Sequence, residues 1–253
     1  MYDEDASPAS QYRERLKQRR RLRDDEIMRC AARLFARDGY EASTFKLIAR
    51  AAGVSLPSVV AHFLDKEALL LQICERHLDG LMAAIERADD PDQPPRDRLD
   101  AMAVALAEAI GAAPEAHRVL AMARTTLGEA RRKDLRVRER WLVALAAATL
   151  EAAAPKLAQH RDLAMPAILS LLAQLDGHAA WFRGDGPMSR ADYARFVVAG
   201  SLAAVRQASH APAAAPSTTT ATDGTRHAVS RAKPTRARAK SAGVLTVPVQ
   251  TGS

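Results

Sequence analysis

Two short amphipathic segments joined by a tight turn constrain this chain more than any other feature of its sequence. Thr44 is a good helix cap, and apolar residues follow with the spacing of a helix face at Phe45, Ile48, Ala49 and Ala52. Ser55 begins a second helix that we expect to end near His62, with Pro57 in its first turn. Between the two, Gly53 supplies the backbone freedom of a sharp turn. A short helix, a turn and a second short helix is the pattern of a helix-turn-helix, although an ordinary connection in a helical bundle has the same elements.

The rest of the chain predicts further helices and an all-α fold. Aromatic residues make up 4% of the sequence, alanine and leucine dominate, and runs of β-branched residues are missing over long stretches. Ile27, Ala31, Leu34 and Phe35 form the stripe of a first helix that Gly39 ends, and Asp65 is placed to cap a fourth. Apolar periodicity predicts later helices over about 96–112, 115–127, 135–154 and 168–182, and a last one after Ser189.

Charge and composition divide the chain into four parts. We expect a disordered lead-in and basic arm over 1–23, a helix-turn-helix domain over 24–70, a larger helical domain over 71–208, and a disordered basic tail over 209–253. The net charge is +3 over 1–66, −1 over 67–208 and +5 over 209–253, so the positive charge lies towards the ends. A basic arm next to a helix-turn-helix favours DNA as partner, while a solvated charge run is the alternative.

The N-terminal module resembles the tetracycline-repressor-like (TetR/AcrR) family of bacterial regulators. The matching residues, in order, are Ala31-Ala32-Arg33-Leu34-Phe35, Gly39-Tyr40, Ser43-Thr44, Ile48-Ala49, Ala51-Ala52-Gly53-Val54-Ser55, His62-Phe63 and Lys66-Glu67-Ala68-Leu69-Leu70. So many ordered matches are far more specific than a lone turn motif. The resemblance implies a homodimeric, all-α transcription regulator with three DNA-binding helices and a larger domain that senses a small-molecule effector.

The resemblance also implies which residues contact double-stranded DNA. Thr44, Ser58, His62 and Lys66 match positions that touch backbone phosphate, which sets register without reading bases. Lys46, Ser55, Leu56, Pro57 and Ser58 stand at the start of the recognition unit, where Leu56 and Pro57 offer apolar contacts only. The family commonly has tyrosine where this chain has Val60, so a phosphate-directed hydroxyl is missing. Arg19, Arg20 and Arg21 of the basic arm are expected to compensate along the phosphates or in the minor groove.

The larger domain is expected to hold an effector pocket and the dimer contact. Met122, Trp141, His178, Trp181 and Phe182 are candidate pocket residues, with plain core packing as the alternative. By resemblance, the stripes near 168–182 and 193–205 form a four-helix bundle between two subunits, which fits a pseudo-palindromic operator. The hypothesis for regulation is that an effector shifts the helix over about 65–87 and thereby lowers operator affinity.

The sequence lacks the motifs that several classes of function require. The chain has no Glu-x-x-His, no Cys-x-x-Cys, no phosphate loop and no nucleophile elbow, so we expect no metal, no cofactor and no catalysis. Two cysteines, Cys30 and Cys74, in helical apolar patterns fit a reducing compartment, and no apolar run is long enough to span a membrane. A cytoplasmic location is expected. The alternative function is an architectural or weakly specific DNA-binding protein that uses its two basic termini, and the basic tail is equally compatible with a solubilising extension.

Overall fold

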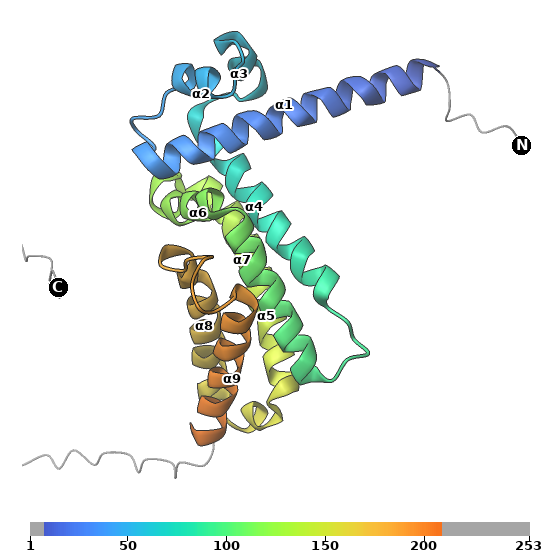
Figure 1. Ribbon diagram of the computed structural model, residues 1–253, viewed down its shortest axis with the longest axis vertical. Helices are drawn as coiled ribbons and strands as arrows, with labels where there is room; N and C mark the ends of the chain where they lie inside the picture. Colours follow the sequence, from blue (N-terminus) through green and yellow to red (C-terminus); the bar gives the residue numbers. More distant parts are fainter. Residues whose placement is uncertain (1–7, 209–253) are drawn as a thin grey trace, which may run out of the picture. The chain divides into compact units, whose positions relative to one another are not determined.

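The computed structural model describes residues 8–208, and this part of the chain is almost entirely helical, without strands (Figure 1). The predicted all-α fold is confirmed. In chain order the elements are α1 (Pro8–Asp38), α2 (Phe45–Ala51), α3 (Leu56–His62), α4 (Lys66–Ala88), α5 (Pro95–Ala112), α6 (Pro114–Thr126), α7 (Glu129–Ala153), the 3-10 helix η2 (Pro155–Gln159), α8 (Arg161–Gly177), the 3-10 helix η3 (His178–Ala180) and α9 (Arg190–Ala208).

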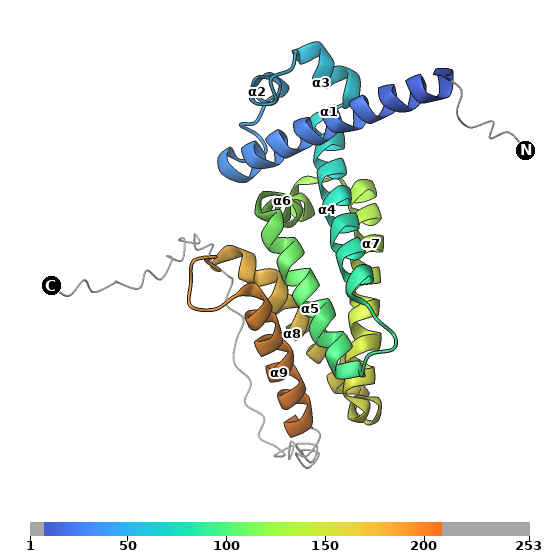
Figure 2. The same cartoon turned by 45° about the vertical axis from the view of Figure 1, so that its right-hand side comes forward.

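Helix α1 separates the helix-turn-helix from the rest of the described chain. In the two views, α2 and α3 lie on one side of α1 and α6 lies on the other (Figures 1 and 2). The C-terminal half of α1 supplies the fully buried Ile27, Ala31 and Phe35. Burial of a side chain as large as Ile27 or Phe35 contributes roughly 1.5–3 kcal/mol to the stability of the fold.

Helices α4 to α9 form the larger helical body. Helix α5 packs against α4, α7 and α9, and α8 packs against α7 and α9. One buried apolar cluster runs from Ile27 in α1 to Val205 in α9. The predicted boundary between residues 70 and 71 falls inside α4, so this helix belongs to both predicted domains, whose division stays a prediction.

The chain is helical much earlier than the sequence pattern predicts. That pattern indicates disorder up to residue 23, yet α1 begins at Pro8. From Ala9 to Asp38 the chain contains neither glycine nor proline and is rich in arginine, leucine and glutamine, which favour helix even where charge repels. The predicted lead-in is therefore wrong from Pro8 onward. The helix predicted over 168–182 also differs, because α8 starts at Arg161 and ends at Gly177. The predicted tail over 209–253 lies outside the described residues.

Candidate DNA interface and ligand cavity

Three side-chain caps set the geometry of the α2–α3 unit. The Thr44 hydroxyl accepts a hydrogen bond from the Leu47 amide, and the Ser55 hydroxyl accepts one from the Ser58 amide, both at 3.3 Å. The Asp65 carboxylate caps α4 in the same way. Each cap satisfies an amide that the helix itself leaves without a partner, worth about 1 kcal/mol. All three predicted caps are confirmed.

Gly53 makes the turn between α2 and α3 with φ of +64°. Residues with a Cβ rarely adopt this left-handed conformation, so glycine is the residue this turn requires. Ile48 of α2 and Val59 of α3 are fully buried against the cluster that contains Phe35. The turn and the two buried side chains together fix how α3 lies on the module.

The exposed face of α3 is apolar. Leu56 and Val60 are exposed at 42% and 54% of their surface, and Pro57 and Ala61 are exposed beside them. Lys46, on α2, is also exposed. In a major groove such a face makes apolar contacts. The apolar group that DNA presents there is the methyl group of thymine.

Two of the predicted phosphate contacts are engaged within the protein. The His62 ring contacts the Asp24 carboxylate of α1, and only 13% of its side chain is exposed. The Lys66 ammonium donates to the Tyr40 carbonyl at 2.8 Å and lies 4.1 Å from the centre of the Tyr40 ring. These contacts tie α3 and α4 to α1 and to the loop after it. Thr44 and Ser55 are exposed while they cap, and Ser58 is half-buried.

The basic arm is the exposed N-terminal half of α1, which extends past α2, α3 and α4 in both views (Figures 1 and 2). Because successive helical residues are about 100° apart, Arg19, Arg20 and Arg21 point in three different directions. A helix about 10–12 Å across is wider than a minor groove of about 6 Å, so a helical arm favours contacts along the phosphates. Contact of these three arginines with DNA stays a prediction. Residues that share a face are Arg15, Arg19 and Arg23 on one side and Arg13, Lys17 and Arg20 on another.

The start of α4 is anchored to the junction of α6 and α7. Arg131 of α7 donates to both oxygens of Asp65 at 3.1 and 3.2 Å and pairs with Glu67 at 3.2 Å. Glu67 in turn accepts a hydrogen bond from the Gly128 amide at 2.8 Å. The Arg131 guanidinium holds the pKa of Asp65 below its usual value. These contacts connect the junction of α6 and α7 to the helix that follows α3.

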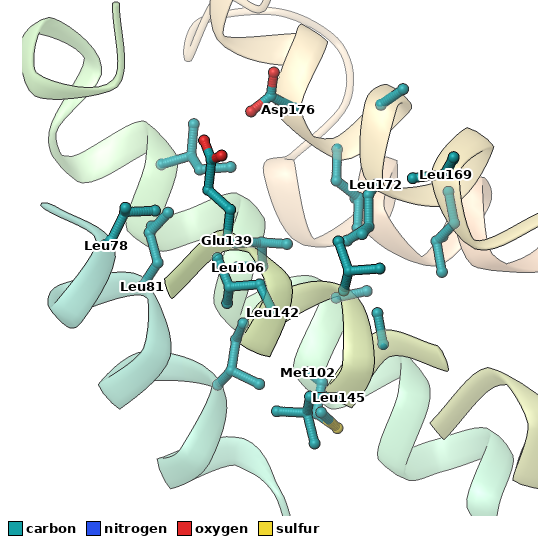
Figure 3. A pocket seen from close by; sticks show the side chains of 18 of the residues that line it. Leu78, Leu81, Met102, Leu106, Glu139, Leu142, Leu145, Leu169, Leu172 and Asp176 are labelled. Atoms are coloured by element: carbon teal, nitrogen blue, oxygen red, sulfur yellow. The ribbon is translucent and has the colours of Figure 1, made fainter. Parts of the chain in front are cut away.

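A cavity of about 390 Å³ lies inside the larger body (Figure 3). Its walls come from α4, α5, α6, α7 and α8 and are mostly aliphatic: Leu78, Leu81, Ile85, Leu99, Met102, Leu106, Ile110, Leu120, Leu142, Val143, Leu145, Leu169, Leu171, Leu172 and Leu175. The size falls within the range of small-molecule sites. The carboxylates of Glu139 and Asp176 lie towards one end, and Met102 and Leu145 lie towards the other.

The polar end of the cavity is built from two pairs. Arg124 of α6 donates to the Glu139 carboxylate of α7 at 3.0 Å, and the His117 Nε2 atom of α6 lies 3.2 Å from the Asp176 carboxylate of α8. His117 lowers the pKa of Asp176 through this hydrogen bond. On its other side, the His117 Nδ1 atom lies 3.1 Å from Nε2 of the buried His77 in α4. The row of side-chain contacts from Asp176 through His117 to His77 connects α8 at the cavity wall to α4.

The five pocket residues predicted from the sequence do not line this cavity. Trp141 and Trp181 are exposed at 37% and 61%, and Met122 packs beside the core. His178, Trp181 and Phe182 instead border a separate recess between α5, α6, η3 and α9. The prediction favours aromatic side chains, but this cavity is walled by aliphatic ones. Nothing in their sequence pattern distinguishes Leu106 or Leu142 from ordinary core residues.

Helices α8 and α9 carry unpartnered apolar faces in the described chain. On α9, Phe196 is 65% exposed, and Ala199, Gly200, Ala203 and Ala204 are exposed on the same face. On α8, Met165 and Leu169 are each 51% exposed. Val198, Leu202 and Val205 of α9 are buried within the subunit. The last helix thus has two apolar faces, one buried within the subunit and one uncovered in the described chain.

The described residues include no helix long and apolar enough to cross a membrane.

Comparison with known proteins identifies both parts of the chain. A family model described as bacterial regulatory proteins of the tetR family matches residues 27–73. A second, described as the tetracyclin repressor-like C-terminal domain, matches residues 92–205. The first match runs from the middle of α1 into α4, and the second runs from just before α5 into α9.

Individual proteins show the same similarity. The chain is 34% identical over 77 residues to the HTH-type transcriptional regulator YerO of Bacillus subtilis, a match that covers 30% of this chain and 27% of that protein. It is 33% identical over 88 residues to the HTH-type transcriptional repressor KstR2 of Mycolicibacterium smegmatis, covering 35% of this chain and 43% of that protein. The matches thus span less than half of these curated relatives. A crystal structure of a TetR-family regulator from Bordetella parapertussis is similar at 27% identity with a TM-score of 0.66, covering 71% of this chain and 93% of that one.

Proposed function

This chain belongs to the tetR family of bacterial regulatory proteins, and on that premise we propose that it is a ligand-responsive repressor that binds a pseudo-palindromic operator as a homodimer. It is a DNA-binding transcriptional regulator and not an enzyme, as the family is. We place its action in the cytoplasm, where the operator is accessible. Repression is proposed because KstR2, one of the relatives, is a repressor.

The observation that carries the proposal is the α2–turn–α3 unit. Gly53 and the caps at Thr44 and Ser55 hold α3 so that Leu56, Pro57 and Val60 are exposed along one face. A helix fixed in this way, with an exposed face and a basic helix beside it, is suited to a major groove. Thr44, Lys46 and Ser58 remain proposed contacts, while His62 and Lys66 are proposed to position α3 and α4.

The proposed dimer contact is the uncovered face of α8 and α9. Phe196 and the small residues Gly200 and Ala204 lie on one side of α9, and Met165 and Leu169 are exposed on α8. Small residues allow two helices to approach closely, and the same patch on both subunits makes a two-fold contact. Two α3 helices related in this way would read half-sites about 34–36 Å apart.

The proposed effector site is the aliphatic cavity. A ligand that fills it contacts α4 through Leu78 and Leu81 and meets His117 and Asp176 at the polar end. The His77–His117 pair and the Arg131–Asp65 pair both connect this body to α4. We propose that α4 has two arrangements, only one of which suits operator binding. A ligand that binds the other arrangement better raises its population, and the coupling free energy between ligand and operator binding is typically about 1–3 kcal/mol.

A second candidate function is architectural, weakly specific DNA binding. The observation in its favour is that the α3 face offers no hydrogen-bonding side chain at Leu56, Pro57 or Val60, while the α1 extension is strongly basic. Such a protein would bind through phosphates alone, with little preference for sequence.

Selection of bound sequences from a random duplex library separates the two. A regulator of this kind enriches a pseudo-palindrome with two half-sites on the same face of the duplex. An architectural protein enriches no common sequence, and that result would overturn the proposed function. Repeating the binding with compounds that raise the melting temperature of the protein then tests whether ligand binding lowers operator affinity.

A further inference from the structure

A second recess, separate from the aliphatic cavity in character, lies where α5 ends and α9 begins. It has a volume of about 520 Å³ and is bordered by Ile110 and Gly111 of α5, the start of α6, η3 with the residues after it, and Arg190 of α9. The side chains with chemistry in its wall are Arg118, His178, Trp181, Phe182, Arg183 and Arg190.

The charge of this recess is unbalanced. Three guanidinium groups line it, and none of the lining residues is acidic. Arg118 has a carboxylate of Glu115 at 3.7 Å, which is a loose pairing at a half-exposed side chain. By contrast, Arg124 and Arg131 elsewhere in the body are closely paired with carboxylates. Positive charge gathered without an equal number of carboxylates favours an anion.

Two buried nitrogen atoms in the recess wall lack hydrogen-bond partners in the described chain. They are Nε2 of His178, whose residue is fully buried, and Nε of Arg190. Arg190 also lies over the Phe182 ring, with its guanidinium carbon 4.9 Å from the ring centre. A buried donor without a partner costs roughly 1–3 kcal/mol, so the Arg190 Nε–H group favours an acceptor from outside the chain. His178 donates its Nδ1 proton to the Leu175 carbonyl, so its Nε2 atom is an acceptor that a protonated phosphate oxygen could meet.

Gly111 makes room for Arg190. A Cβ atom at position 111 would lie 2.6 Å from the Cδ and Cζ atoms of Arg190 and closer still to its Nε atom, much nearer than atoms approach. Gly111 lies in α5, near its end, where glycine weakens a helix relative to alanine. The glycine therefore costs helix stability and leaves the space in which the guanidinium lies.

We propose that this recess binds the phosphate group of a small-molecule ligand. Guanidinium groups match phosphate oxygens with paired hydrogen bonds, and Arg118, Arg183 and Arg190 bring three of them to one place. Trp181 and Phe182 add aromatic faces suited to a planar group attached to the phosphate. The site is independent of the proposed DNA interface, because none of these residues belongs to α2 or α3.

The test uses the full chain in the absence of DNA. The basic helix α1 also attracts anions, so the signal must come from a group in the recess itself. Trp141 and Trp181 are the two tryptophans of the sequence. In a W141F background, Trp181 therefore reports binding at the recess itself. Titration with inorganic pyrophosphate and with ADP is expected to change Trp181 fluorescence saturably, with ADP binding more tightly if the base uses the aromatic faces. A wild-type recess that gives no saturable change with either probe would overturn the proposal.

Variants in the same background locate the site. The double change R118Q/R183Q is expected to weaken pyrophosphate at least tenfold, whereas R140Q, which neutralises an arginine of α7 outside the recess, leaves the affinity unchanged. G111A is expected to keep its helical circular dichroism while it loses binding, because the new methyl group displaces Arg190. Equal effects of R118Q/R183Q and R140Q would contradict the proposal. Operator binding by R118Q/R183Q is measured in parallel, so a failure here is distinct from a failure of the proposed function.

Discussion

Nε2 of His77 in α4 lies 3.1 Å from Nδ1 of His117 in α6, and both rings are buried. Nε2 of His117 faces the Asp176 carboxylate and donates to it. Burial, and next the neighbouring His117, lower the pKa of His77 to about 4. His77 is therefore neutral in the folded protein at physiological pH.

The first prediction follows from that pKa. An unfolded histidine has a pKa near 6.5, so between about pH 6.5 and 4 the unfolded chain takes up a proton that folded His77 does not. The free energy of unfolding is therefore expected to fall as pH drops through this window, by at most about 1.4 kcal/mol per pH unit from this group. Urea unfolding at several pH values measures it. H77Q keeps a hydrogen-bonding group and should flatten the slope, and an unchanged slope would contradict the assignment.

The second prediction concerns the exposed position on α3. V60Y places a hydroxyl where the family commonly has one, and we expect it to tighten binding by about 1 kcal/mol through a phosphate contact. Because phosphate carries no sequence information, affinity for operator and for random duplex should rise together. Fluorescence anisotropy on both duplexes checks this, with V60F as the control that adds the ring alone. An increase in affinity confined to the operator would contradict this and would place residue 60 at a base edge.

The third prediction concerns the helical basic arm. Arg15, Arg19 and Arg23 share one face of α1, and R15Q/R19Q/R23Q removes that face while leaving Arg13, Lys17 and Arg20. If the face follows the phosphates, the slope of log affinity against log salt becomes shallower by about 0.9 for each phosphate that is no longer neutralised. R136Q/R140Q, on α7, is the control and should leave the slope alone. An unchanged slope in the triple variant would make the arm a solvated extension.

The fourth prediction concerns assembly. Phe196 is the largest exposed apolar side chain on α9, and F196E places a charge in the proposed dimer contact. An unpaired buried charge is costly, so we expect monomers in sedimentation velocity at micromolar concentration and weaker operator binding. V137E makes the same kind of change at a 54% exposed residue of α7 and should leave the assembly intact. A dimer that persists in F196E would place the contact elsewhere.

Local signals in the sequence predict the DNA-binding module well. Thr44, Ser55 and Asp65 cap helices through amides only three residues away, so their role depends on neighbours that the sequence itself displays. The turn at Gly53 is local in the same sense. The start of α1 differs from the prediction because a run of like charges indicates disorder, whereas the individual residues of that run favour helix.

The cavity and the recess cannot be predicted in this way. Leu106 of α5, Leu142 of α7 and Leu172 of α8 come together only through packing between helices, and their spacing equals that of core residues. Likewise Arg118 and Arg190 are far apart in sequence, and their approach to one recess depends on the packing of α6 against η3 and of α9 against α5. The family resemblance implies phosphate contacts for His62 and Lys66. Their partners within the protein, Asp24 and the Tyr40 carbonyl, are tertiary contacts that the sequence does not display.

Sequence-specific binding by two subunits is tested by titrating the purified protein against the duplex recovered by selection and against two altered forms of it. One form has a single half-site scrambled, and the other has both scrambled, at the same length and salt. Two subunits are expected to bind the intact duplex on the order of 10³-fold or more tightly than the fully scrambled one, with the half-scrambled duplex between them. Equal affinity for all three duplexes would contradict sequence-specific binding.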